Sequence, residues 1–146
     1  MKPNPLLKTV VTAAQGLQAL FKTLEPFLGT AQAAAIRYGL RGEEGELFRV
    51  KLEEYASRVQ GMPKTYETEE RGVDSVAHLH YFTSAFDWYV TERDIYPEQL
   101  QAFGVAYLGR NPEVGYINLV ELLAAGAELD LYFTPAPLRE IARARA

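Results

Sequence analysis

The stretch AFDWYVTERD, residues 85–94, decides the fold class that the sequence predicts. Apolar and aromatic residues alternate in it with more polar ones, which is the period of two that a half-buried strand requires. The same alternation recurs in FGVAY, residues 103–107, and in LDLYF, residues 129–133. Because short connections join such segments, antiparallel neighbours are favoured over parallel crossovers. The sequence therefore predicts an antiparallel sheet of about four to five strands.

The apolar side of these strands is expected to face one common core. Its members would be Phe86, Trp88, Val90, Phe103, Val105, Leu129, Leu131 and Phe133. The residues between them would then face outward. This outward series comprises Asp87, Tyr89 and Thr91, with Glu92 and Asp94 just beyond them, and Asp130, Tyr132 and Thr134 on the last strand.

The first part of the chain has the period of a helix instead. From Leu7 to Leu24, apolar residues recur at spacings of three and four, and Pro26 and Gly29 end the pattern. A second helix is expected over residues 30–38 and a third over residues 47–59, ending at Gly-Met-Pro.

Two short helices are expected after the strands. Asn118 and Glu121 have the spacing of a capping box, which opens a helix through Leu123. Thr134 and Pro135 would open a final helix that carries three arginines toward its C-terminal end, where cations suit the helix dipole. The predicted class is α+β, with a helical region over residues 1–62 and an antiparallel α+β domain over residues 63–146 that together form one compact unit.

Composition sets further bounds. A chain of 146 residues, 48% hydrophobic and 23% charged, matches one globular domain. The absence of cysteine excludes disulfides, thiolate metal sites and cysteine nucleophiles. Residues 9–21 are uncharged but are interrupted by polar residues, so they match neither a signal peptide nor a membrane span. We therefore expect a cytoplasmic protein without a membrane partner.

The net charge of −4 is unevenly distributed. Residues 1–71 hold ten Lys or Arg and nine acids, whereas residues 72–146 hold five bases and ten acids. Nucleic-acid affinity depends largely on cations that neutralise phosphates, so nucleic-acid binding by the second half is disfavoured. The helical half offers a basic series, but acids interleave it, and a solvated helix face is the simpler interpretation. That series is Lys8, Lys22, Arg37, Arg41, Arg49 and Lys51.

Acids and tyrosines form the more distinctive candidate surface. If the outward series is exposed, tyrosines would supply contact area and carboxylates would select a partner with a basic surface. The candidate binding residues are Tyr89, Glu92, Tyr116, Asp130 and Tyr132. The alternative is that helices cover this face and that the tyrosines pack beneath them.

His78 and His80 are the only histidines, and their spacing places both on one face of a strand. With an acid such as Asp87 or Glu92 as the third ligand, the two histidines could bind a metal ion. A small metal-dependent hydrolase is therefore an alternative function. However, the sequence holds no His-Glu-x-x-His motif, no Gly-x-Ser-x-Gly elbow and no phosphate-binding glycine loop. We expect no cofactor, no tightly held metal and no catalytic residues.

The second half of the chain contains four motifs in a fixed order: WYVTE at residues 88–92, PEVGY at 112–116, LVEL at 119–122 and DLYFTPAPLREI at 130–141. In this order they resemble a family of small proteins of unknown function from plasmids, phages and conjugative elements. The resemblance covers somewhat under half of the chain. It implies a setting on a mobile genetic element and carries no established reaction.

These observations favour a non-enzymatic accessory protein of a mobile element that binds a basic host protein in a counter-defence role. A nucleic-acid accessory protein that acts through the N-terminal helices is a second alternative, beside the hydrolase. The apolar seam from Leu7 to Leu24 could pack internally or join two copies of the chain as a homodimer.

Overall fold

The computed structural model describes residues 13–146. Three helices come first, with a 3-10 turn, η2 (Glu25–Phe27), between the first two: α1 (Ala13–Leu24), α2 (Thr30–Gly39) and α3 (Gly45–Gly61). The last two match the helices expected over residues 30–38 and 47–59. The part of the expected first helix before Ala13 lies outside the described residues.

The strands form the predicted antiparallel sheet. Its five strands have the spatial order β5-β4-β3-β2-β6. They are β2 (Leu79–Phe82), β3 (Asp87–Glu92), β4 (Ala102–Tyr107), β5 (Glu113–Ile117) and β6 (Glu128–Leu129). Two short helices, α4 (Leu119–Ala124) and α5 (Leu138–Arg145), complete the chain. The α+β class with helices first is thus confirmed.

The strand expected over residues 129–133 is shorter than the alternation suggests. β6 ends at Leu129, and Asp130 then turns the chain, because its side chain accepts a hydrogen bond from the Tyr132 backbone N–H at 2.9 Å. The final helix also starts later than Thr134. Residues 136–137 form β7 (Ala136–Pro137), which pairs with β1 (Val76–Ala77), so the helix begins only at Leu138. The Asn118 side chain does cap α4, accepting from the Glu121 N–H at 3.2 Å.

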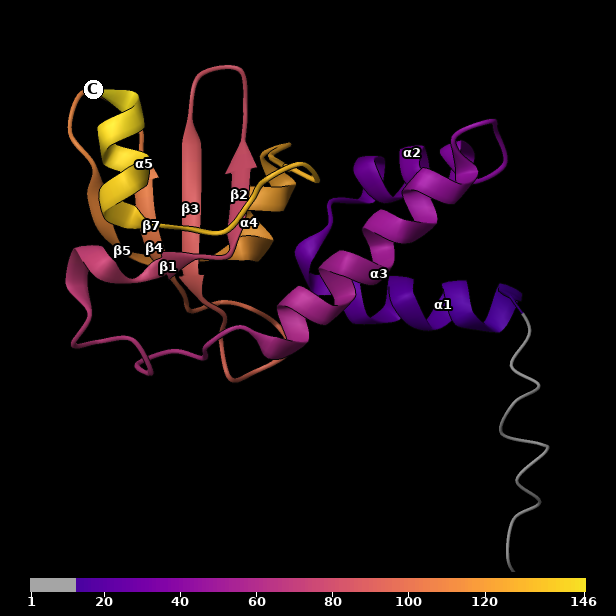
Figure 1. Cartoon of the computed structure of the whole chain (residues 1–146), viewed down its shortest axis with the longest axis horizontal. Helices are drawn as coiled ribbons and strands as arrows, with labels where there is room; N and C mark the ends of the chain where they lie inside the picture. The colour runs from indigo at the N-terminus through magenta and orange to yellow at the C-terminus, as the bar shows by residue number, and fades with distance from the viewer. Residues whose placement is uncertain (1–12) are drawn as a thin grey trace, which may run out of the picture.

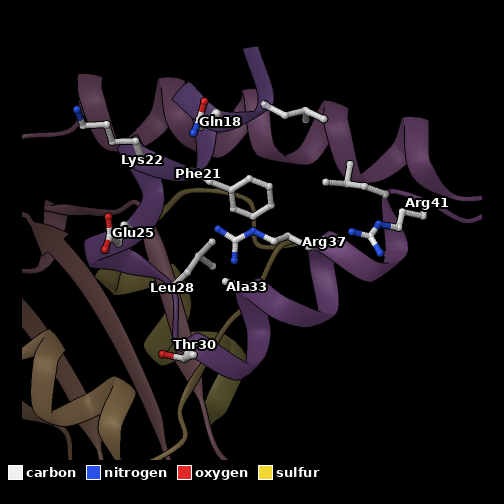
Figure 2. A pocket seen from close by; sticks show the side chains of 11 residues that line it. Gln18, Phe21, Lys22, Glu25, Leu28, Thr30, Ala33, Arg37 and Arg41 are labelled. Atoms are coloured by element: carbon white, nitrogen blue, oxygen red, sulfur yellow. The ribbon is translucent and has the colours of Figure 1, made fainter. Parts of the chain in front are cut away.

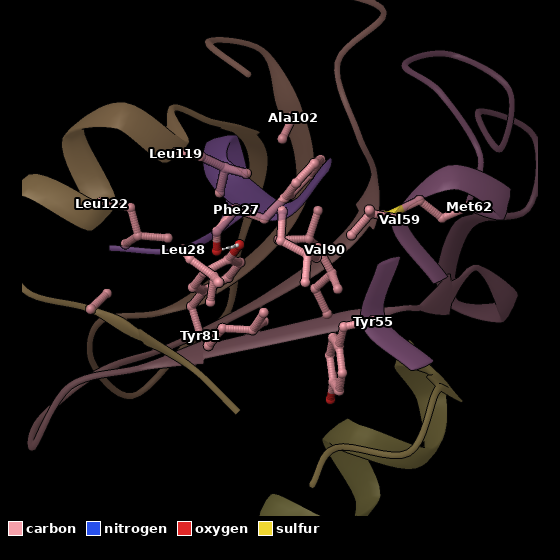
Figure 3. Close-up of a cluster of buried hydrophobic side chains, with 14 of the residues drawn as sticks. Phe27, Leu28, Tyr55, Val59, Met62, Tyr81, Val90, Ala102, Leu119 and Leu122 are labelled. Carbon is pink, nitrogen blue, oxygen red and sulfur yellow. Dashed lines mark hydrogen bonds between the residues drawn. The ribbon is translucent and has the colours of Figure 1, made fainter. Parts of the chain in front are cut away.

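One face of the sheet packs against the N-terminal helices (Figure 3). Tyr81 is fully buried there and donates a hydrogen bond to the Phe27 carbonyl at 2.6 Å, and its burial raises the pKa of its hydroxyl. The cluster joins strand residues to α1, η2, α3 and α4, and includes Leu24, Leu28, Leu52, Tyr55, Val59, Leu79, Val90, Ala102, Leu119, Leu122 and Leu129. The helical region and the sheet therefore share this core, and α1 to α3 project to one side of the sheet (Figure 1).

The opposite face of the sheet is covered by α5. Ile141 packs there with Tyr89, Val105 and Tyr107, and Phe133 and Leu138 join this second cluster. The expectation of one common core is therefore wrong: Trp88, Val90, Leu129 and Leu131 belong to the first cluster, Val105 and Phe133 belong to the second, and Phe86 is 39% exposed. Strict alternation predicts one buried and one solvent-exposed face, but clusters of buried side chains lie on both faces of this sheet.

The two edges of the sheet differ. At the β6 edge, the Gln32 side chain of α2 accepts a hydrogen bond from the Leu129 N–H at 2.8 Å and donates one to the Leu129 carbonyl at 2.7 Å. The Gln32 amide thus takes the place of a neighbouring strand in the hydrogen bonding of β6. A strand edge with unpaired backbone groups could otherwise pair with another chain. At the other edge β5 pairs with β4 alone.

Within residues 13–146, no helix combines the length and the apolar character needed to cross a membrane.

Gly104 in β4 provides a test of this packing. A methyl group there would overlap the Tyr89 carbonyl oxygen of β3, whereas Gly115, opposite Gly104 on β5, has nothing within 4 Å of the same position. Because the obstacle is backbone, Gly104→Ala is expected to lower the free energy of unfolding by about 1–3 kcal/mol. Gly115→Ala should change it by less than about 0.5 kcal/mol. Chemical denaturation followed by circular dichroism measures both; equal stabilities would contradict the register of β3 and β4.

Candidate binding site

An irregularity in β3 decides what the α5 side of the sheet contains. Val90 pairs with Gly104, but the next pair is Glu92 with Phe103, so two residues of β3 oppose one of β4. Such a bulge re-aims side chains, because strict alternation would have sent Glu92 to the same face as Val90. Thr91 and Glu92 instead both lie on the α5 side, and the Thr91 hydroxyl donates to the Phe103 carbonyl at 3.2 Å.

The Glu92 carboxylate holds the segment that follows α3. Its Oε1 accepts from the Tyr66 N–H and its Oε2 from the Thr68 N–H, both at 2.8 Å, and the Thr68 hydroxyl donates to Oε2 as well. Glu92 is only 2% exposed. Tyr66 has φ 77, a left-handed conformation that is uncommon outside glycine. The buried carboxylate therefore fixes a constrained turn over the face of the sheet.

This turn, α5 and the edge strand line a partly open pocket of about 470 Å³. Apolar side chains dominate its walls: Val73, Phe103, Val105, Tyr107, Val114, Leu138 and Ala142. Thr68, Ser75, Thr91 and Glu92 add a few polar groups. Its volume and its mainly apolar lining with a few polar groups are typical of ligand-binding pockets.

Two tyrosines stand at the pocket. The hydroxyls of Tyr66 and Tyr116 are 2.6 Å apart, and this hydrogen bond raises the pKa of Tyr116. Tyr66 is 62% and Tyr116 54% exposed. Glu69 also lines the pocket, and residues 66–74 hold four acids and one base. Among the lining residues Glu69 is the one exposed acid, so the pocket is mainly apolar, with two tyrosines and one exposed carboxylate at its border.

The structure unites two of the five predicted binding residues and separates the others. Glu92 and Tyr116 line the same pocket. Tyr89 does not face outward: it is 8% exposed and stacks on His80, with ring centroids 4.6 Å apart. The expectation that Tyr89 and Glu92 form an exposed face is wrong, because α5 covers the former and the turn at Tyr66 covers the latter.

Asp130 and Tyr132 lie at the other edge of the sheet, since they follow β6 while Tyr116 belongs to β5. Tyr132 is 72% exposed, with the Lys51 ammonium 4.9 Å from its ring centroid. The backbone carbonyl of Asp130 accepts a hydrogen bond from Tyr55 at 2.5 Å. The one acidic and aromatic patch that the sequence predicts is thus divided between two edges.

The two histidines do not share a site. Both ring nitrogens of His80 contact carboxylates, Nε2 with Asp87 at 2.7 Å and Nδ1 with Asp130 at 3.0 Å. His78 makes no such pair; burial, helped by Arg58, lowers its pKa. Among residues 13–146 no group of three or more His, Asp or Glu side chains is arranged to hold a metal ion. The described residues therefore do not assemble the ligand set that the hydrolase alternative requires.

Comparison of the chain with protein-family models, with curated proteins and with solved structures finds no match. The resemblance to a family of proteins from mobile elements therefore stays a prediction.

Sequence reasoning missed most of the pocket. Tyr66 and Val73 lie in a segment for which the sequence predicts no helix or strand, and Leu138 lies within the expected final helix. The position of Tyr66 depends on its backbone hydrogen bond to Glu92, and no local sequence pattern predicts that contact. The one available signal was Tyr66 itself, an aromatic residue among the acids of an otherwise polar connector.

The role of Glu92 can be measured by stability. Glu92→Ala removes a buried charged acceptor and leaves two backbone N–H groups unpaired, so it should lower the free energy of unfolding by about 3 kcal/mol. Glu92→Gln keeps one oxygen and should lose less. Glu69→Ala, exposed in the same pocket, is the matched control and should change stability by less than about 0.5 kcal/mol. If Glu92→Ala and Glu69→Ala changed the free energy of unfolding equally, Glu92 would not be what holds the turn at Tyr66.

The lowered pKa of His78 predicts the direction in which stability changes with pH. Its pKa is lower in the folded protein than in the unfolded chain, so the unfolded chain binds the proton more readily. Its contribution to stability is therefore present above the ordinary histidine pKa and is lost as the pH falls. His78→Asn should lose less stability than the wild type between about pH 7.5 and pH 5. Urea denaturation at both pH values measures the difference; parallel losses would show that His78 does not titrate in this way.

Proposed function

We propose that this chain is a non-enzymatic binding protein that recognises a basic protein partner through the pocket between β5 and α5. The partner would insert an apolar or aromatic side chain into the pocket, with lysine or arginine beside it. The observation that carries the proposal is the combination of an apolar cavity of about 470 Å³ with two exposed tyrosines at its border.

The chemistry of the border supports a protein partner. Tyrosine offers a large amphipathic contact area at low entropic cost, and aromatic residues are prominent among interface hot spots. Tyr66 and Tyr116 are already held by their mutual hydrogen bond and by the edge-to-face contact of Tyr116 with Phe103, at 5.7 Å between centroids. Little side-chain freedom remains to be lost on binding. The acids of residues 66–74 favour a basic partner.

The setting that fits this surface is the one implied by the resemblance: an accessory protein of a mobile element that acts on a basic host protein, for instance a component of host defence. Such a protein needs no active site. Of the alternatives, the hydrolase gains no support from His78 and His80. A nucleic-acid partner does not suit an acidic border, which repels phosphates.

The proposal is tested by selecting displayed peptides on the immobilised protein. Enriched peptides should share an aromatic or aliphatic residue next to lysine or arginine. Val114 and Tyr116 are 69% and 54% exposed, so Val114→Arg and Tyr116→Ala should alter the pocket without unfolding the protein. Each variant should weaken the selected peptides by roughly thirtyfold, as expected for loss of a hot spot of about 2 kcal/mol. Fluorescence anisotropy gives the dissociation constants.

Tyr132→Ala is the matched control, because Tyr132 is an exposed tyrosine at the opposite edge of the sheet. It should bind the selected peptides as the wild type does. Peptides that tolerate Val114→Arg and Tyr116→Ala but fail with Tyr132→Ala would assign binding to the β6 edge. Selection of acidic peptides would contradict the basic partner.

A further inference from the structure

A second concave surface lies on the helical side of the molecule. It is an open groove of about 1020 Å³ between α1 and α2 (Figure 2). Apolar side chains from both helices and from the segment between them line it: Leu17, Phe21, Leu28, Ala33 and Leu40. None of these belongs to the pocket between β5 and α5, so the groove is a separate site.

Three cations gather at this groove: Lys22 from α1, Arg37 from α2 and Arg41 just after α2. Arg37 reaches across from α2, and its guanidinium carbon is 4.2 Å from the centroid of the Phe21 ring (Figure 2). Glu25 is the one acid in the lining. The groove is therefore cationic in a chain whose net charge is −4.

These cations differ from the other members of the basic series. Arg49 lies 3.6 Å from Glu46, and Lys51 lies 3.2 Å from Glu54, so α3 neutralises its own bases. Among residues 13–146, by contrast, no ion pair involves Lys22, Arg37 or Arg41. The charge on the groove is thus available to a partner.

We propose that the groove binds an acidic amphipathic helix of a partner protein. The apolar face of that helix would lie on Leu17, Phe21 and Leu40, and its carboxylates would meet the three cations. A groove between two helices with an apolar floor suits a third helix, which presents apolar residues at spacings of three and four. Arginine also pairs well with carboxylates, because its planar fork can donate two hydrogen bonds at once.

Two other occupants fit less well. Nucleic acid gains its affinity from contacts between cations and phosphates. Glu25 would repel a phosphate, and the apolar floor of the groove cannot bind one. A second copy that packed α1 against α1 would bring like charges together, because residues 13–24 contain Lys22 and no acid. The described part of the predicted dimer helix is therefore complementary to an acidic partner rather than to itself.

The test uses a fluorescent peptide of about 16 residues with leucines at helical spacing and glutamates elsewhere. Its matched control has lysines in place of the glutamates. Anisotropy at near-physiological salt should show binding of the acidic peptide and at least about tenfold weaker binding of the basic one. Arg37→Glu with Arg41→Glu should weaken the acidic peptide at least about tenfold, whereas Arg49→Glu should leave it within about twofold.

Arg41→Glu alone is tested too, because it leaves the contact of Arg37 with Phe21 in place, and circular dichroism verifies that each variant is folded. Equal binding of the two peptides, or no loss on charge reversal, overturns the proposal. Displacement of the acidic peptide by duplex DNA that binds more tightly would make the groove a nucleic-acid site. A concentration-dependent dimer in sedimentation that Arg37→Glu abolishes would make it a contact between copies.

Discussion

The bulge in β3 places a carboxylate where an apolar face would otherwise continue, and the pocket is a consequence of that placement. Glu92 cannot remain buried and charged without donors, because removing a carboxylate from water costs several kcal/mol unless hydrogen bonds replace the lost hydration. The donors come from Tyr66 and Thr68, on a segment with no regular structure of its own. Together with the backbone hydrogen bond from Thr65 to Arg93, this buried charge positions the segment that lines the pocket and brings Tyr66 to Tyr116.

The second requirement is that both faces of the sheet be covered. The helical side uses α1, η2, α3 and α4, and the other side uses the single helix α5, which is too short to cover every strand. α5 covers β3 and part of β4 through Ile141, and the face beside β5 stays open. The pocket forms where this cover ends. Arg145 fixes the end of α5, since its Nη1 is 3.1 Å from Asp87 and its guanidinium carbon is 3.9 Å from the centroid of the Tyr107 ring.

The sequence was sufficient for the helices, the antiparallel strands and the fold class, because those depend on local periodicity. It was not sufficient to predict which face of the sheet each strand residue would occupy. Tyr89 and Thr91 count as polar in an alternating pattern, yet both are buried, since tyrosine and threonine pack well once their hydroxyls are accommodated. The bulge at Thr91 has no signature in a single sequence, and without it Glu92 would point to the other face. Tyr116 was recognisable as a candidate, but its neighbours Tyr66 and Leu138 come from distant segments.

The two candidate surfaces have opposite charge and a fixed relation to each other. Tyr55 and Arg58 of α3 donate hydrogen bonds to the carbonyls of Asp130 and Phe133, at 2.5 and 2.9 Å, so the helical layer is tied to the chain that leads into α5. The groove between α1 and α2 and the pocket beside β5 therefore belong to one packed unit. On the two proposals made above, a basic and an acidic partner bound at these surfaces would meet at an effective concentration set by the packing of the helical layer on the sheet.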